Sequence, residues 1–273
     1  MVTIMKPLPG PAETSVVPPT RLANFRDMGG GVTRDGRRIK SGLLFRSEEP
    51  SRLRARDVAA LQALPLRLIC DLRAPSEVQK RPPPRALVQS IQAVNIPLHD
   101  EAMQSGMRNR FKEFLFNPNG DVRFREFNRD YYHYLAFERA AQIRQVLTLL
   151  AQDGPLPALL HCTAGKDRTG VVVALLQLLL GLPFAEVLNE YLRSNDGFRP
   201  RMNRIITAVR LLTLFRVPGQ RMRYFLTTHP EFLQDTYESI LDRYQTIENY
   251  LIVSCGVDST IQRRLQDRFL TDS

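Results

Sequence analysis

The sequence has only three cysteines in 273 residues, Cys70, Cys162 and Cys255, and they lie far apart. Cysteines that are so few and so widely spaced exclude a disulfide framework, and they indicate a reducing compartment or a free thiol. The longest apolar run, GVVVALLQLLLGL, is shorter than the ~20 residues of a membrane-spanning helix. The first twenty residues lack the apolar core of an export signal. We therefore expect a cytoplasmic protein, or one exported without a conventional signal peptide.

Acidic residues are in the minority: 38 Lys and Arg against 28 Asp and Glu give a formal net charge of +10. This charge favours encounters with anionic partners, which include phosphorylated substrates, an anionic membrane surface and nucleic acid. Because the chain has no zinc-finger spacing, no helix-turn-helix glycine pattern and no RNP-like aromatic strand, we expect no nucleic-acid ligand. The histidines lack metal-ligand spacing, so no metal site is predicted. The oligomeric state stays open.

The order of apolar and turn-forming segments predicts one domain. Residues 1–20 contain five prolines and predict a flexible leader, so the domain is expected over 21–273. A glycine-rich hairpin is predicted first, then strands at 66–73, 90–98 and 157–161. Helices are predicted over 52–64 with Ser51 as N-cap, over 122–150 in two parts, and over 168–181. Residues 101–119 predict a mobile loop or a short helix.

Strands that alternate with helices predict an α/β fold with a mostly parallel central sheet flanked by helices. After residue 181 the pattern is all-helical. Segments with helical spacing follow one another with no strand between them. We therefore expect residues 182–273 to form a helical extension that packs on the α/β core as a cap or lid.

The stretch LLHCTAGKDRTG, residues 159–170, ends an apolar strand on a thiol and continues into a tight loop and a helix. The N–H groups of such a loop and the dipole of the helix favour a bound anion. It is not a nucleotide loop, because Asp167 follows Lys166 where a Walker A motif needs Ser or Thr, and the pattern G-x-G-x-x-G is absent.

Five residues separate Cys162 from Arg168. A cysteine at the mouth of an anion-binding loop has its thiolate stabilised, which lowers its pKa below the usual value of about 8.5 and makes it nucleophilic. The loop between can surround a tetrahedral dianion, and Arg168 can bind two of its oxygens. Attack of the thiolate on phosphorus would give a phosphocysteine. The alternative is a buried, inert thiol.

The segment HCTAGKDRTG resembles the C-x5-R active-site loop of cysteine-based protein tyrosine phosphatases. Its interior resembles the bacterial atypical branch that acts on phosphotyrosine and phosphoinositides. The segments NFRDMGG, GLLFRS, DLR, EYLRSN, YQTIENYL and LQDRFL resemble the same branch in the same order, so the likeness covers about residues 21–270. The resemblance implies a phosphatase-type α/β domain with a helical cap, and neither metal nor cofactor.

The resemblance also implies roles for the loop residues. Cys162 would be the nucleophile and Arg168 the phosphate clamp, Thr169 would hydrogen-bond the departing thiolate, and His161 would help to keep the thiol acidic. The residues expected to surround the phosphate are Thr163, Ala164, Gly165, Lys166, Asp167 and Arg168.

The general acid has two candidates. The chain has no Trp, so the Trp-Pro-Asp acid loop of other tyrosine phosphatases cannot be present. Asp167 is the first candidate, and Asp100 in PLHDEAM is its rival. Lys166 adds a charge typical of lipid-directed members, although Lys166 and Asp167 could instead form a local salt bridge that only shapes the loop.

Two functions of different classes follow. The first is a protein tyrosine phosphatase that acts on phosphotyrosine and other phosphomonoesters, including phosphoinositides. The second is a catalytically inactive phosphatase fold that binds phosphorylated ligands. A third chemistry, arsenate reduction or sulfur transfer, would need shuttle cysteines that Cys70 and Cys255 are not placed to supply.

Arg46, Asp71 and Arg73 are expected to brace the loop.

Overall fold

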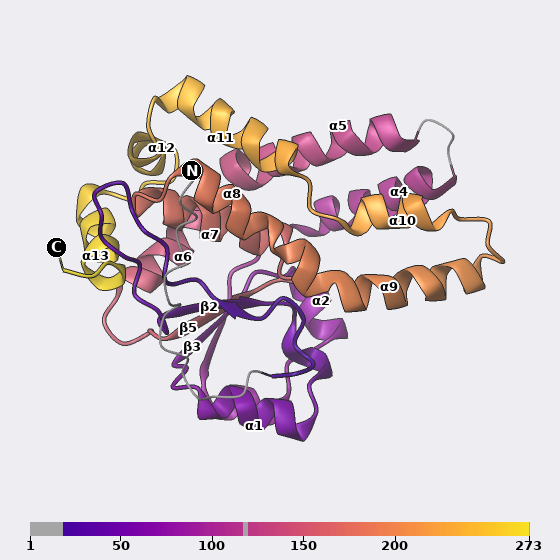
Figure 1. Cartoon of the computed structure of the whole chain (residues 1–273), viewed down its shortest axis with the longest axis horizontal. Helices are drawn as coiled ribbons and strands as arrows, with labels where there is room; N and C mark the ends of the chain where they lie inside the picture. Colours follow the sequence, from indigo (N-terminus) through magenta and orange to yellow (C-terminus); the bar gives the residue numbers. More distant parts are fainter. Residues whose placement is uncertain (1–18, 117–119, 273) are drawn as a thin grey trace, which may run out of the picture.

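The computed structural model describes residues 19–116 and 120–272, so the predicted leader lies almost entirely outside the described residues. Five strands form one sheet in the order β1-β2-β5-β3-β4 (Figure 1). They are β1 Arg26–Asp27, β2 Leu44–Ser47, β3 Leu68–Asp71, β4 Gln92–Asn95 and β5 Ala158–His161. Only β1 is antiparallel to its neighbour. The predicted mostly parallel α/β fold is confirmed.

Successive residues of the central strands point to opposite faces of the sheet, as strand geometry requires. Ile69 and Leu159 pack on the side of α1 Ala55–Ala63 and α3 Arg85–Ser90. Cys70 and Leu160 point to the other side. The helices there are α6 Ala140–Ala151, α7 Asp167–Leu179, α8 Phe184–Leu192, α11 Pro230–Tyr244, α12 Ile247–Val253 and α13 Ser259–Phe269. Both faces are therefore covered.

Helix α7 is apolar on all sides, and the structure buries nearly all of it. It packs against α8 and α12 as well as against the layer over the sheet. A helix apolar all round needs such an enclosed position, because any exposed face would leave apolar surface in water. The burial fixes the direction of α7, and with it the position of its N-terminus at the carboxyl end of β5.

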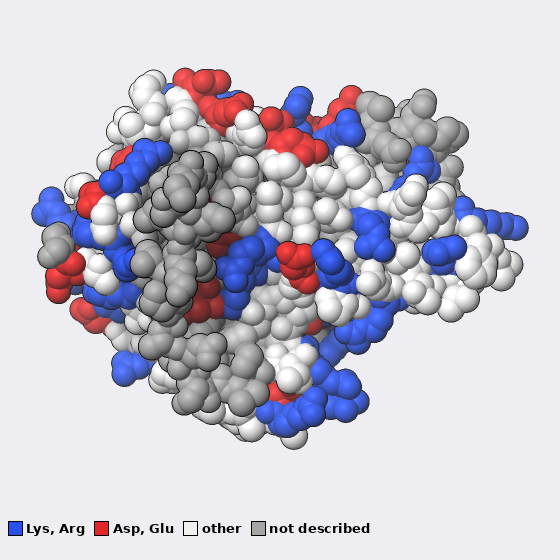
Figure 2. Space-filling view, viewed as in Figure 1, with Lys and Arg blue, Asp and Glu red and all other residues white. Residues whose placement is uncertain are grey.

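Four helices form a cap that projects beyond one edge of the sheet (Figure 1). They are α4 Glu101–Phe116, α5 Gly120–His133, α9 Ser194–Leu212 and α10 Gly219–Leu226. The cap has an apolar cluster of its own, made by Phe114, Phe124, Phe198, Met202, Ile206, Val217 and Met222. On the face shown in Figure 2, Lys and Arg atoms gather along α9.

Two local predictions were wrong. Residues 101–116 form a helix of 16 residues rather than a mobile loop or short helix. Ser51 is not an N-cap: it lies in the 3-10 turn Pro50–Arg52, its hydroxyl bonds Glu49 at 2.6 Å, and α1 begins only at Ala55. The predicted division of 122–150 is present, as a π-helical turn at Tyr134–Glu138 between α5 and α6. Helix α2, Pro75–Lys80, was not predicted. Within the described ranges no helix is both long and apolar enough to cross a bilayer.

Candidate active site

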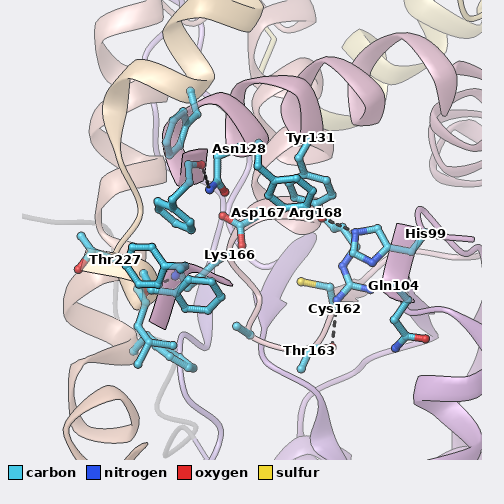
Figure 3. A pocket seen from close by; sticks show the side chains of 18 of the residues that line it. His99, Gln104, Asn128, Tyr131, Cys162, Thr163, Lys166, Asp167, Arg168 and Thr227 are labelled. Atoms are coloured by element: carbon cyan, nitrogen blue, oxygen red, sulfur yellow. Dashed lines mark hydrogen bonds between the residues drawn. The ribbon is translucent and has the colours of Figure 1, made fainter. Parts of the chain in front are cut away.

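Cys162 lies where three parallel strands end together. It follows β5, whose last residue, His161, is level with Ser47 of β2 and Asp71 of β3. The loop 162–166 then enters α7 at Asp167. The side chain of Cys162 is buried at the base of a cavity of about 610 Å³, and Figure 3 shows its sulfur beside the guanidinium of Arg168. The cavity is thus at the carboxyl edge of the sheet, where α/β folds place their ligands.

Side-chain hydrogen bonds to a backbone carbonyl hold the loop in place. The carbonyl of Gly165 accepts hydrogen bonds at 2.7 Å from Asn24 Nδ2 and from Arg46 Nη2, and Glu190 fixes Arg46 at 2.9 Å. Because the C=O and N–H of a peptide point in opposite directions, carbonyls turned toward Arg46 leave loop N–H groups for an anion in the cavity. Gly165 has φ +64°, and a Cβ there would lie 2.2 Å from the carbonyl oxygen of Ser47, so only glycine fits.

Arg168 faces a carboxylate. Its Nη1 and Nη2 donate to Glu77 Oε2 and Oε1 at 2.6 and 3.1 Å, and Nη2 also donates to Thr163 Oγ1 at 3.0 Å. Burial opposes the charge on both partners. Charge interactions with Cys162 and Glu77 nevertheless keep the pKa of Arg168 above its usual value, and Arg168 lowers the pKa of Glu77 to about 2. Both groups are therefore ionised at neutral pH.

Asp167 belongs to a chain of buried hydroxyls. Tyr132 of α5 donates a hydrogen bond to Asp167 Oδ1 at 2.6 Å, and its hydroxyl also bonds that of Tyr191 on α8. Burial, with Asp167 alongside, raises the pKa of both tyrosines well above the usual value, so they remain neutral donors. Asp167 lines the cavity, and this contact fixes the orientation of its carboxylate.

Lys166 points from the loop toward the cap. Its buried Nζ donates to the carbonyl of Leu226 at the end of α10 and lies 5.5 Å from the ring centre of Phe198. Burial lowers the pKa of the Lys166 ammonium group. The side chain makes this contact with the cap rather than a salt bridge with Asp167. The Lys166 side chain therefore links the loop 162–166 to the cap.

Three other predicted site residues, His161, Thr169 and Asp100, differ in their burial and in their position relative to the cavity. His161 is buried, with Nδ1 3.7 Å from Asp71 Oδ1, and burial lowers the pKa of its ring. The hydroxyl of Thr169 is buried without a hydrogen-bond partner among the described residues, so it makes none to Cys162. Asp100 lies outside the set of residues that line the cavity. It caps α4 through the N–H of Met103 at 2.7 Å and pairs with Arg139.

The predicted bracing residues are fixed by their own contacts. Arg46 bonds the loop directly. Arg73 pairs with Asp71 at 2.6 Å and with Glu49 at 2.8 Å, one layer further from the cavity. Over the described part of the chain, no group of three or more His, Cys, Asp or Glu side chains could hold a metal ion.

This loop, with its buried cysteine, clamped arginine and braced backbone, can be compared with known proteins. A sequence model described as the tyrosine phosphatase family matches residues 17–271. The chain belongs to this family.

Two similar proteins are bacterial. One is a protein of Cupriavidus necator named as a tyrosine-protein phosphatase, 30% identical over 248 residues, which are 87% of this chain and 83% of that one. The triple specificity protein phosphatase PtpB of Mycobacterium tuberculosis is 34% identical over 204 residues, 67% and 71% of the two chains. The solved catalytic core of the PP-IP phosphatase SIW14 of S. cerevisiae gives a TM-score of 0.38 at 19% identity, over 66% of this chain and 79% of that one. The family assignment rests on the sequence matches.

Sequence reasoning missed several residues that surround the site of this phosphatase. Glu77 received no role, although the spacing DLRAPSEV places it just after a strand that ends at the same edge. His99 has no predicted role either. It lines the cavity and its Nε2 bonds the hydroxyl of Tyr131. Six phenylalanines from the cap and α11 also line the cavity: Phe114, Phe124, Phe127, Phe198, Phe225 and Phe232.

Proposed function

We propose that this member of the tyrosine phosphatase family hydrolyses phosphotyrosine and other phosphomonoesters, including phosphoinositides, through a phosphocysteine at Cys162. The observation that carries the proposal is the loop itself. A buried cysteine and a charged arginine face one cavity across a backbone whose carbonyls are held outward. This arrangement suits a tetrahedral dianion better than it suits a carboxylate or a neutral ligand.

The reaction would have two displacements at phosphorus. In the first, the Cys162 thiolate attacks, an S–P bond forms, the bond from phosphorus to the ester oxygen breaks, and the leaving oxygen takes a proton from the acid. In the second, water loses a proton to the same group as its oxygen attacks, the S–P bond breaks, and phosphate and thiolate are released. Arg168 and the loop N–H groups stabilise the charge on the phosphoryl oxygens in both steps.

Asp167 is the acid we propose. Its carboxylate lines the cavity and is oriented by Tyr132, whereas Asp100 bonds Arg139 and the N-terminus of α4 outside the cavity wall. A general acid must come within hydrogen-bond reach of the leaving oxygen. Asp167 already lines the cavity, whereas Asp100 would first have to break its pair with Arg139.

The cavity supports a broad substrate range. Its aromatic walls suit the ring of a phosphotyrosine, which can pack against them at centroid separations of about 4.5–7 Å. Next to the loop, a smaller cavity is lined by three cations, Arg73, Lys80 and Arg81, and by two carboxylates, Glu49 and Glu77. Its lining keeps a net positive charge, which would favour further phosphate groups of a phosphoinositide. The relative PtpB is named as a triple specificity phosphatase, which is consistent with a broad range here.

The competing function, an inactive module that binds phosphorylated ligands, is disfavoured because Cys162, Asp167 and Arg168 are all present and face one cavity. A turnover assay decides between the two. We expect the wild type to release phosphate from p-nitrophenyl phosphate, phosphotyrosine peptides and phosphoinositides, and Cys162→Ser to abolish all three activities. Cys255→Ser is the matched control, since Cys255 is a buried thiol that lies outside the cavity wall.

The acid is tested in the same panel. Asp167→Asn is expected to lower kcat by ~10²–10⁴, the usual contribution of general acid catalysis, while Asp100→Asn leaves it near the wild-type value. The converse ranking would assign the acid to Asp100. Full activity in Cys162→Ser would contradict the phosphocysteine mechanism, and a wild type without turnover on any substrate would support the binding module.

A further inference from the structure

The turn between α9 and α10, residues 211–216, holds more exposed large apolar side chains than any other described segment of its length. Leu211, Leu212, Leu214 and Phe215 are 58%, 84%, 77% and 61% exposed. Only three other large apolar side chains in the described part of the chain are exposed, at Val32, Ile252 and Val253. The turn, which we call the cap tip, lies at the far end of the hairpin in Figure 1. Such a concentration marks an interaction surface.

The cap tip is an ordered turn, with its apolar side chains held outward. Phe215 N–H donates to the carbonyl of Arg210 at 2.7 Å, and Leu214 N–H to that of Leu211 at 3.1 Å, which is the bonding of a Schellman helix end. Such an end normally has glycine at the left-handed position, yet here Leu214 has φ +50° and Phe215 φ +60°. Val217 is fully buried directly below. Folding alone would favour glycine, so these two side chains are unexplained by packing.

The charge around the cap tip has one sign. Residues 197–230 contain seven arginines, no lysine and no acidic residue, so this stretch carries +7 of the chain's net +10. Arg210 and Arg216 flank the tip and are exposed, and Arg210 lies 5.1 Å from the ring centre of Phe215. Figure 2 shows Lys and Arg atoms among uncharged ones, without Asp or Glu, over the far end of the hairpin.

We propose that the cap tip inserts into the interfacial region of an anionic lipid bilayer, with Arg210 and Arg216 at the level of the lipid phosphates. A projecting apolar tip ringed by arginine matches the chemistry of interfacial membrane anchors, in which apolar burial and attraction to anionic headgroups add together. A second copy of this chain fits less well, because a symmetric contact through the tip would bring Arg210 and Arg216 of one copy close to the same two arginines of the other.

This surface is separate from the candidate active site. Leu212 lies fourteen positions after Phe198, which lines the cavity, so the two are ~21 Å apart along α9 at the helical rise of ~1.5 Å per residue. The proposal therefore does not rest on the chemistry of Cys162. Its failure would leave the proposed phosphatase activity untouched, and the converse also holds.

The absence of tryptophan from the chain makes a direct test simple. Phe215→Trp places one fluorophore at the tip, and Val253→Trp places one at a 72% exposed position on α12 as the control. With phosphatidylcholine vesicles that contain about 30% phosphatidylserine, we expect a blue shift of the emission for Phe215→Trp and none for Val253→Trp. No shift for the tip variant, or equal shifts for both, would overturn the proposal.

Flotation with the same vesicles measures the binding. Leu214→Gly suits the left-handed backbone, so it removes the apolar side chain without strain, and we expect vesicle affinity to fall about tenfold. Arg210→Gln with Arg216→Gln should weaken binding by a similar factor, as should raising the salt from about 0.1 M to about 1 M. Hydrolysis of soluble p-nitrophenyl phosphate is expected to stay at the wild-type level in all these variants.

Two further results would overturn the proposal. Equal affinity for pure phosphatidylcholine would remove the role of the arginines. A concentration-dependent dimer, seen by light scattering in the wild type and lost in Leu214→Gly, would assign the tip to a second copy of the chain instead.

Discussion

Replacing Glu77 by glutamine tests how Arg168 is held in position before substrate arrives. The guanidinium donates to both carboxylate oxygens, at 2.6 and 3.1 Å. The amide of glutamine keeps one acceptor and turns the other into a donor that faces a donor, so one charge-assisted hydrogen bond is lost. Such bonds contribute about 1.5–3 kcal/mol. Because the pair borders a cavity open to water, we expect the free energy of unfolding to fall by ~1–2 kcal/mol.

The same substitution should slow catalysis. With Arg168 less firmly oriented, kcat/KM for p-nitrophenyl phosphate should fall about tenfold, which corresponds to ~1.4 kcal/mol of transition-state stabilisation. Phosphate or vanadate would supply the missing negative charge, so either anion should raise the Tm of Glu77→Gln more than that of the wild type. The Glu77 contribution is present above the unfolded pKa of about 4.3 and is lost as the pH falls toward the folded value of about 2, so neutral assays measure it fully.

Glu101→Gln is the matched control for this experiment. Glu101 accepts a hydrogen bond from Ser76 of α2 at 2.9 Å, but this contact is exposed, so stability should change by less than ~0.5 kcal/mol. The opposite behaviour of Glu77→Gln, a lower KM and a higher kcat/KM at unchanged stability, would show that Glu77 competes with substrate for Arg168. That result would refute its role as a positioning residue.

Three further outcomes are expected. Gly165→Ala should abolish turnover and phosphate binding in a protein with wild-type circular dichroism, because its Cβ would lie 2.2 Å from the Ser47 carbonyl. Tyr132→Phe should lower kcat about tenfold with KM unchanged, since Asp167 loses the 2.6 Å hydrogen bond that orients it. Burial lowers the pKa of His99, so below about pH 6.5 the unfolded chain binds a proton at this histidine and the folded chain does not. The free energy of unfolding should therefore fall by up to ~1.4 kcal/mol per pH unit as the pH decreases. In thermal melts, His99→Asn should show a smaller decrease of Tm with falling pH than the wild type.

The strand, loop and helix around Cys162 could be predicted because their determinants are local. An apolar run, a glycine that alone fits its position, and a helix apolar all round lie within about twenty consecutive residues. Glu77, the carboxylate that holds Arg168, could not be predicted in this way. Glu77 is 91 positions from Arg168, and the two meet only because β3 and β5 are parallel neighbours whose carboxyl ends coincide. No single segment of the sequence determines the order of the strands in a sheet.

The cap shows the same limit for secondary structure. Residues 101–119 have a mixed charged and aromatic pattern that predicts a mobile loop or a short helix, yet α4 is a helix of 16 residues. Its Phe114 packs at 4.8 Å from the ring of Phe124 and at 5.6 Å from that of Phe225. A helix of this length gains most of its stability from tertiary packing. The aromatic partner on α10 is more than a hundred residues away, so no window of sequence contains the reason for the helix.

Most of the net positive charge of the chain lies in one segment of the cap. Of the net +10, residues 197–230 carry +7, and the remaining 239 residues carry only +3. The screening length at physiological salt is ~8 Å, whereas ~21 Å of α9 separates the cap tip from the cavity. The tip arginines therefore cannot draw a phosphate ester into the cavity. Positive charge near the cavity is supplied instead by Lys166 and Arg168 at the loop and by Lys80 and Arg81 in the smaller cavity beside it. In our two proposals these cations serve the substrate, and Arg210 and Arg216 serve the membrane surface.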